Sequence, residues 1–135
     1  MKQDIAAARV VFGCGVPLVQ LPCKGVVSQF TISKPELEFW LKGKSPIADY
    51  LATHTINTAE AYGAGTSWTR AIWDVTAVAW LMNDTDNLMW SDIRDTFVPT
   101  YDHKYETDSR FPMRYVYFIH RDNLMTELIK RILNR

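Results

Sequence analysis

The sequence predicts a mixed α/β domain in which an open sheet is flanked by helices, and three observations lead to this fold class. The chain has 135 residues, the usual size of one domain. Hydrophobic residues make up 47% and charged residues 22%, so the chain can bury a core and is not disordered. Helix-like and strand-like segments alternate along it, which is typical of α/β architecture. We therefore expect residues 1–135 to form a single domain.

The N-terminal part is expected to hold a helix followed closely by a strand. Asp4 can cap a helix over residues 5–12, which the glycines at 13 and 15 end. The short apolar run 17–22 is bounded by prolines and predicts a strand. A second apolar segment follows and ends in Phe30-Thr31-Ile32.

Two helices are expected next. Ser33 and Glu36 have the spacing of a capping box and predict a helix that ends at Gly43. Ser45-Pro46 predicts the start of the next helix. We expect Ile47, Tyr50, Leu51 and His54 to fall on one face of this helix.

The central part of the chain predicts a loop and then a buried helix. Residues 62–66 contain two glycines and interrupt the helical pattern, which indicates a flexible loop. Residues 83–87 are polar and predict a second loop. Between these loops we expect a helix over 69–82, with its apolar positions at Ile72, Val75, Val78, Ala79 and Met82.

The C-terminal part predicts two strands and a final helix. The strands are expected at 95–98 and 113–119, joined by a charged connection. The last helix is amphipathic, and we expect Asp122 to cap it. Its buried residues should be Leu124, Leu128 and Ile132.

Charge and targeting signals exclude several classes of function. The formal net charge is zero, whereas nucleic-acid-binding proteins usually carry a strongly basic face. No window approaches the ~20 apolar residues of a membrane span, and no secretory signal is clear at the N-terminus. These features predict a cytoplasmic protein that binds neither nucleic acid nor membrane. Cys14 and Cys23 are expected to be free buried thiols, with one disulfide as the alternative.

The dipeptide Trp73-Asp74 is the first feature that points to chemistry. It places a carboxylate in an otherwise apolar helix, where a charge is costly unless it is paired or binds a metal. The alternative is a partly exposed Asp in a first helical turn, stabilised by the helix dipole. The three histidines are too scattered along the chain to predict a metal site.

The residues around this dipeptide resemble a known family. The segment A-I-W-D-V-T-A-V-A-W-L at 71–81 resembles the late helix of inosine–uridine preferring nucleoside hydrolases. The segment Q-D-I-A-A-A-R-V-V-F-G-C-G-V-P at 3–17 is similar to that family's D-P-E-A-A helix and the turn after it, with Ile5 in place of proline. Residues 115–133 are similar to the family's closing strand and helix.

The resemblance implies a fold and a set of site residues. The fold would be part of a nucleoside-hydrolase-like, Rossmann-like open sheet. In the complete enzymes calcium assists hydrolysis of the N-glycosidic bond of ribonucleosides to ribose and free base. By resemblance, Asp74 would be a Ca²⁺ ligand and Trp73 would stack on the nucleobase. Tyr62, on the preceding loop, would close over the base, although Gly63 and Gly65 predict an ordinary loop there equally well.

The family's N-terminal D-x-D-x-x-x-D-D cluster has no counterpart in this chain, so no catalytic residue is assigned. The chain would be the C-terminal portion of a nucleoside hydrolase, inactive alone and associating with itself or with a missing N-terminal half. Two alternatives remain open. One is an inactive relative that binds nucleosides or sugars, or only assembles with a partner. The other is an unrelated α/β domain.

Overall fold

The computed structural model describes residues 4–85 and 87–134 and has the predicted mixed α/β architecture. Three strands form one sheet in the order β1-β5-β4, and β2 and β3 form a second, two-stranded sheet. No helix among the described residues has the length and apolar character needed to cross a membrane. The elements in chain order are α1 (Ile5–Gly13), β1 (Val19–Gln20), the 3-10 helix η1 (Val27–Gln29), β2 (Thr31–Ser33), α2 (Lys34–Trp40), α3 (Pro46–Ala61), β3 (Thr69–Ala71), α4 (Val75–Trp80), β4 (Met89–Pro99), β5 (Tyr105–Ile119) and α5 (Arg121–Ile132).

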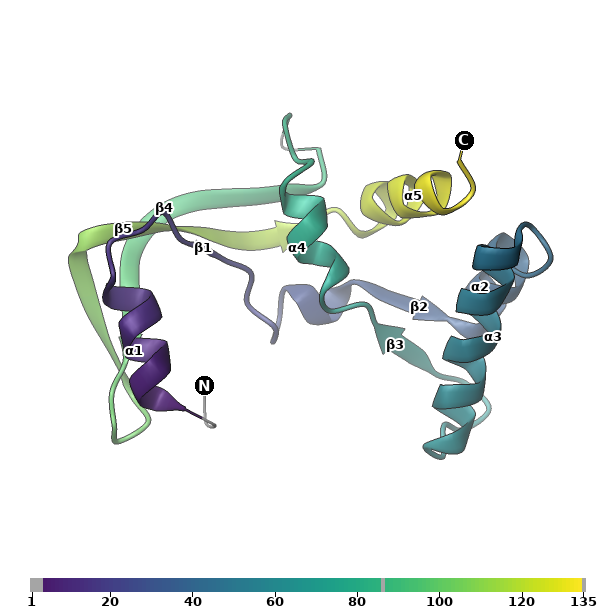
Figure 1. The fold of residues 1–135 in the computed structure, drawn as a ribbon, viewed down its shortest axis with the longest axis horizontal. Coiled ribbons are helices and arrows are strands. Elements are labelled where there is room, and N and C mark those ends of the chain that lie inside the picture. The colour runs from purple at the N-terminus through teal and green to yellow at the C-terminus, as the bar shows by residue number, and fades with distance from the viewer. Residues whose placement is uncertain (1–3, 86, 135) are drawn as a thin grey trace.

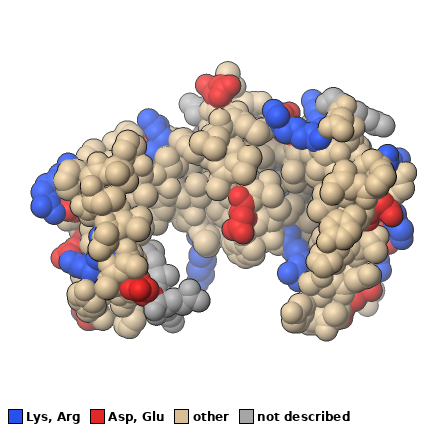
Figure 2. All heavy atoms as spheres, in the orientation of Figure 1, with Lys and Arg blue, Asp and Glu red and all other residues tan. Residues whose placement is uncertain are grey.

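The molecule has the shape of an arch. Figure 1 shows α1 beside the far part of the β4–β5 hairpin at one end, and α2 and α3 at the other end. The near part of the hairpin, β1 and α4 lie between these ends. The space-filling view shows one side hollowed between the two ends (Figure 2). The core runs through the middle of the arch and includes Phe30, Met89, Val116 and Leu124, all at most 2% exposed.

The predicted helix starts are confirmed by hydrogen bonds. A carboxylate oxygen of Asp4 accepts from the amide of Ala7 at 2.8 Å. The hydroxyl of Ser45 accepts from the amide of Ala48 at 3.3 Å. At the start of α2, one Glu36 carboxylate oxygen accepts from the Ser33 amide at 2.8 Å and from the Ser33 hydroxyl at 2.6 Å. Local sequence therefore determines where these helices begin.

The predicted helix over 69–82 is wrong in its first half. Residues Thr69–Ala71 form β3, which pairs antiparallel with β2, and only Val75–Trp80 is helical. The amide of Ile72 also donates to the carbonyl of Phe30 at 2.9 Å. Pairing with β2, which is distant in sequence, thus overrides the local helical pattern.

The face of α3 that carries Ile47, Tyr50, Leu51 and His54 is not the face that it turns to the core. Ile47 is 54% exposed, Tyr50 is 60% exposed, and the exposed His54 ring stacks on that of Tyr50 with centroids 5.6 Å apart. Of the predicted set, only Leu51 is half-buried. The helix instead buries its small side chains together with one isoleucine, because small residues let it approach its neighbours closely. These buried residues are Ala48, Ala52, Ile56 and Ala59.

The two C-terminal strands are longer than predicted. They pair antiparallel from Met89 with Ile119 to Pro99 with Tyr105, so most of the charged connection is strand. Charged side chains are tolerated there because residues 105–112 of β5 are mostly exposed. One of them, Asp108, forms an ion pair with Arg110 at 2.7 Å.

The cap predicted for the last helix is wrong as well. Asp122 lies in the first turn of α5, and His120 occupies the N-cap position. The predicted burial is confirmed for Leu124, while Leu128 and Ile132 are partly buried against the core. The two cysteines are free, as predicted, but both are exposed instead of buried. They lie on the surface because residues 14–16 and 23–25 form irregular segments and turns outside the core.

Arg121 joins the start of α5 to β2 and α2. Its guanidinium donates to the Glu36 carboxylate and, at 2.9 Å, to the carbonyl of Thr31. Burial alone would raise the pKa of Glu36, but hydrogen bonds from Ser33 and Arg121 outweigh it and hold the pKa below its ordinary value. A carboxyl whose folded-state pKa is lowered stabilises the protein above its unfolded-state pKa. That contribution is lost as the pH falls through the folded-state pKa.

We expect Glu36→Gln to reduce the acid dependence of stability. Between about pH 7 and about pH 3, the free energy of unfolding should fall less in this variant than in the wild type, because one low-pKa carboxylate is gone. Urea unfolding at a series of pH values measures the difference. Glu38→Gln, which changes an exposed carboxylate on the same helix, is the matched control and should follow the wild type. Equal pH profiles for Glu36→Gln and Glu38→Gln would contradict this assignment.

Candidate functional site

Trp73 and Asp74 form an exposed corner between β3 and α4. Asp74 is the N-cap residue of α4 and is exposed, and its side chain makes no capping hydrogen bond. Trp73 is 48% exposed. Both side chains are therefore accessible, and the costly unpaired buried charge that the sequence pattern suggested does not arise.

The backbone on both sides of this corner is fixed. The bond from the Ile72 amide to the Phe30 carbonyl anchors the residue before Trp73. The hydroxyl of Thr76, a buried residue, donates to the carbonyl of Trp73 at 2.7 Å. An exposed aromatic ring and a carboxylate are thus carried on a turn whose backbone is held by hydrogen bonds.

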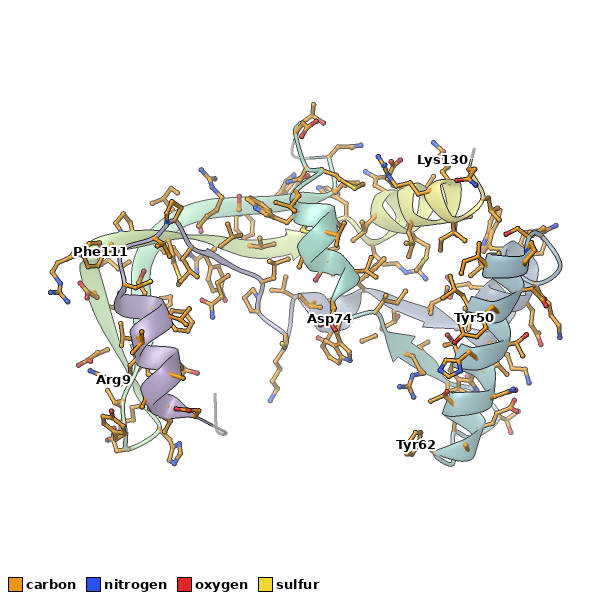
Figure 3. All side chains as sticks on the ribbon, in the orientation of Figure 1. Arg9, Tyr50, Tyr62, Asp74, Phe111 and Lys130 are labelled. Atoms are coloured by element: carbon orange, nitrogen blue, oxygen red, sulfur yellow. The ribbon has the colours of Figure 1, made fainter. Side chains whose placement is uncertain are left out.

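The structure places Asp74 and Tyr62 apart. Figure 3 shows Asp74 at the start of α4, in the middle of the arch, whereas Tyr62 lies at the far, C-terminal end of α3. Tyr62 is 84% exposed, and the next residue, Gly63, has a φ of +77°. Of the three residues singled out from the sequence, only Trp73 and Asp74 are adjacent in this structure.

Calcium does not fit the residues of this chain by themselves. Calcium in proteins takes six to eight oxygen ligands, several of them carboxylates. Within residues 4–85 and 87–134, no group of three or more His, Cys, Asp or Glu side chains is placed to hold a metal ion. Asp74 could supply one carboxylate, so any complete site would need ligands from another polypeptide segment.

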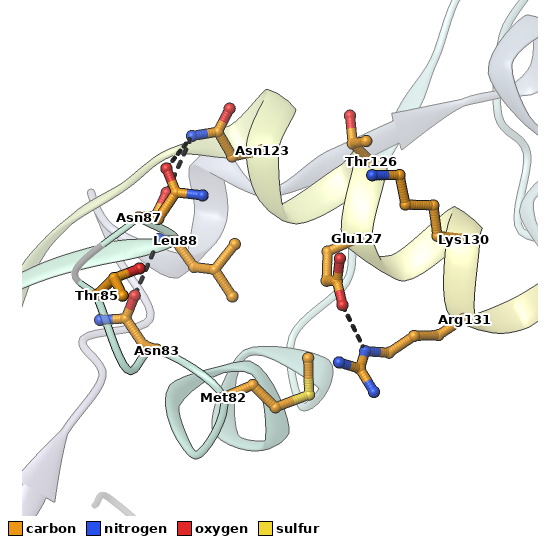
Figure 4. A pocket seen from close by; sticks show the side chains of 10 residues that line it. All are labelled: Met82, Asn83, Thr85, Asn87, Leu88, Asn123, Thr126, Glu127, Lys130 and Arg131. Atoms are coloured by element: carbon orange, nitrogen blue, oxygen red, sulfur yellow. Dashed lines mark hydrogen bonds and ion pairs between the residues drawn. The ribbon is translucent and has the colours of Figure 1, made fainter. Parts of the chain in front are cut away.

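A polar pocket of about 380 Å³ was not predicted from the sequence (Figure 4). It lies between the loop after α4 and one face of α5. The side-chain oxygen of Asn83 accepts from the amides of Leu88 and Met89 at 2.9 and 3.1 Å, which orders one wall. On the opposite wall Arg131 donates to Glu127 at 2.7 Å. The asparagines at 83, 87 and 123 were the signal available in the sequence, but they are brought together only by the fold.

An exposed aromatic cluster also escaped prediction. The rings of Trp90, Phe118 and His120 lie with centroids 4.5–5.0 Å apart. Phe118 and His120 line a second pocket of about 740 Å³ beside the start of α5. The sequence predicted that the strand now seen as β4 begins at residue 95, so Trp90 lay outside it. The contact of the Trp90 ring with Phe118 was therefore not predicted.

Comparison with known proteins supports the fold class. The chain is similar to a solved structure described as a plant nucleoside hydrolase, the PpNRh1 enzyme, with a TM-score of 0.73 and 18% sequence identity. The similarity covers 98% of this chain and 46% of the plant enzyme, so the chain spans less than half of that protein's length. At this level of identity the similarity establishes a nucleoside-hydrolase-like fold. No protein-family profile matches the chain. No curated protein matches it either.

Proposed function

We propose that this chain is the nucleobase-facing part of a nucleoside-hydrolase-like N-glycosidase and acts with a polypeptide that supplies the remaining catalytic residues. The observation that carries the proposal is the match to the plant enzyme over 98% of the chain. The accessible Trp73-Asp74 corner on the arch adds support. The substrate would be a ribonucleoside, which is hydrolysed to ribose and free base.

Trp73 would provide the surface on which the base stacks. Its ring is half-exposed on a fixed turn, and stacking of a base on an aromatic side chain contributes about 1–3 kcal/mol. Tyr62 lies at the end of α3, apart from Asp74. Movement of the loop that follows α3 would bring it over the base. Asp74 would contribute one carboxylate to a Ca²⁺ site whose other ligands come from the second polypeptide. The partner would be a second copy or, as the coverage of the plant enzyme favours, the missing N-terminal half.

A catalytically inactive relative is the second candidate. Such a protein would bind nucleosides or sugars, or would serve only as a subunit of an assembly. The exposure of Asp74, whose side chain makes no capping hydrogen bond and which the resemblance would make a metal ligand, supports this alternative. The two candidates differ in whether the protein, once assembled with its partner, releases free base from a nucleoside. Only the first candidate predicts this release.

Replacing Trp73 is expected to weaken nucleoside binding. The loss of stacking in Trp73→Leu should lower the affinity for inosine or uridine by about 5- to 150-fold, the range that corresponds to about 1–3 kcal/mol. Titration of isotope-labelled protein followed by NMR measures even weak binding. Trp90→Leu is the matched control, since Trp90 is 44% exposed and lies elsewhere on the arch. Equal affinities of the two variants would contradict a role for Trp73.

The chain alone is expected to hydrolyse neither inosine nor uridine, with or without added calcium. Asp74 is one carboxylate, and a calcium site needs six or more oxygens. Chromatographic detection of free hypoxanthine or uracil tests this directly. Calcium-dependent base release by the purified chain would contradict the proposal that catalytic residues are supplied by another polypeptide.

A further inference from the structure

Thr76 is a buried threonine in the first turn of α4, the helix that follows the Trp73-Asp74 corner. The residue is 2% exposed. Its hydroxyl donates to the carbonyl of Trp73 at 2.7 Å, the usual length of a hydrogen bond between two oxygens. The amide of Thr76 reaches the same carbonyl only at 3.4 Å, which is beyond the usual range. The hydroxyl is therefore the stronger of these two donors to the Trp73 carbonyl.

The peptide group between Trp73 and Asp74 links the orientations of both side chains. Its carbonyl belongs to Trp73 and its N–H to Asp74, so rotation of this planar group changes ψ of Trp73 and φ of Asp74 together. Asp74 has a φ of −80° and a ψ of −21°, and its side chain makes no capping hydrogen bond. The bond from the Thr76 hydroxyl therefore holds the one backbone group that Trp73 and Asp74 share.

A methyl group of similar size cannot replace the Thr76 hydroxyl in this contact. A carbon atom approaches a carbonyl oxygen to about 3.3–3.6 Å even in a favourable contact, whereas the Thr76 oxygen lies at 2.7 Å. The β-branched side chain of Thr76 also has few χ1 rotamers, which limits the directions that the hydroxyl can take. In Thr76→Val the new methyl group would displace the Trp73 carbonyl, which would also lose its stronger donor.

We propose that Thr76 is a positioning residue, which sets the directions of the Trp73 ring and the Asp74 carboxylate for a bound nucleoside. It acts through the Trp73 carbonyl and does not touch the nucleoside itself. This inference rests on the proposed function, which gives Trp73 a base to stack on. A binding side chain held in its productive direction before the ligand arrives binds more tightly than one that samples several directions.

NMR spectroscopy of the ligand-free chain tests the positioning independently of binding. The coupling between the amide and α protons of Asp74 depends on its φ, and the indole N–H signal of Trp73 reports the surroundings of the ring. We expect both to change in Thr76→Val, whereas Thr76→Ser keeps the hydroxyl and should resemble the wild type. Thr76→Ala also lacks the hydroxyl and provides the same comparison if the valine variant does not fold.

Thr96→Val is the matched control for a general loss of stability. Thr96 is also buried, and its hydroxyl donates to the carbonyl of Phe111 within the β4–β5 hairpin. Figure 3 shows Phe111 at one end of the arch, well away from Asp74. This variant loses a similar hydrogen bond at a distant place, so its Trp73 and Asp74 signals should not change.

Titration with inosine then measures the consequence for binding. In Thr76→Val we expect the productive direction of the corner to fall to about one tenth of the population, which lowers the affinity about ten-fold. Thr76→Ser and Thr96→Val should bind inosine like the wild type. Unchanged Asp74 and Trp73 signals in Thr76→Val, or an affinity equal to that of the wild type, would overturn the inference. If the wild type binds no inosine, the proposed function fails, while the ligand-free signals still decide whether Thr76 holds the corner.

Discussion

Replacing Phe30 with alanine is expected to lower the free energy of unfolding by about 3–5 kcal/mol. Phe30 is fully buried and is the largest of the side chains with no more than 2% exposure. It lies in the core between η1 and β2, where its side chain is part of the main hydrophobic cluster. The alanine variant would lose this apolar contact and leave a cavity that the surrounding elements fill only partly.

Chemical denaturation followed by tryptophan fluorescence measures the effect. Phe39→Ala is the matched control, because Phe39 is 70% exposed on α2. In this control the free energy of unfolding should fall by no more than about 0.5 kcal/mol, apart from what the lost ring contact with Trp40 contributes. Similar denaturation midpoints for the two variants would show that burial of Phe30 does not stabilise the core.

The same residue connects the core to the candidate site. The Phe30 carbonyl accepts from the Ile72 amide, one residue before Trp73. Loosening of Phe30 should therefore also increase the exchange rate of the Ile72 amide. The position of the Trp73-Asp74 corner thus depends on core packing as well as on the local sequence of its turn.

Local signals predicted the fold class and most helix boundaries. Asp4, Ser33 and Ser45 each act through the amides or side chains of residues three positions away, so a sequence window of four residues contains the information. The pairing of β2 with β3 joins Ile32 to Arg70, 38 positions apart, and no local window contains that information. The helix predicted over 69–82 failed for this reason.

The candidate site was predicted only in part. Trp73 and Asp74 were found because a polar residue interrupts an apolar run, but the helix predicted over 69–82 contained them, whereas they lie just before α4. On α3, periodicity grouped four residues on one face but did not tell whether that face points to the core or to solvent. When small alanines face the core, the larger Ile47 and Tyr50 are left outside, and these are the residues that a hydrophobicity pattern selects. The roles of Trp73, Asp74 and Tyr62 remain predictions.

Replacing Asn83 with leucine is expected to be the second strongly destabilising change. The Asn83 side-chain amide donates to the carbonyl of Met89 at 2.7 Å, and its oxygen accepts from the amides of Leu88 and Met89. Leu88 and Met89 are buried, so their backbone groups cannot readily bind water instead. A buried polar group without a partner costs about 1–3 kcal/mol. Because the groups share one side chain, we expect a combined loss of about 2–4 kcal/mol instead of the full sum.

Asn83→Asp separates the contributions of the donor and the acceptor. Aspartate keeps an oxygen for the amides of Leu88 and Met89 but loses the donor to the Met89 carbonyl, so at neutral pH this variant should be clearly more stable than Asn83→Leu. Hydrogen exchange should show the same order, with the Leu88 and Met89 amides protected in Asn83→Asp and exposed in Asn83→Leu. Equal stability of the two variants would mean that the acceptor bonds contribute little. If the predicted order holds, Asn83 fixes the point at which the chain leaves α4 and enters β4. The wall of the polar pocket and the first pair of the long hairpin, Met89 with Ile119, would then depend on a single side chain.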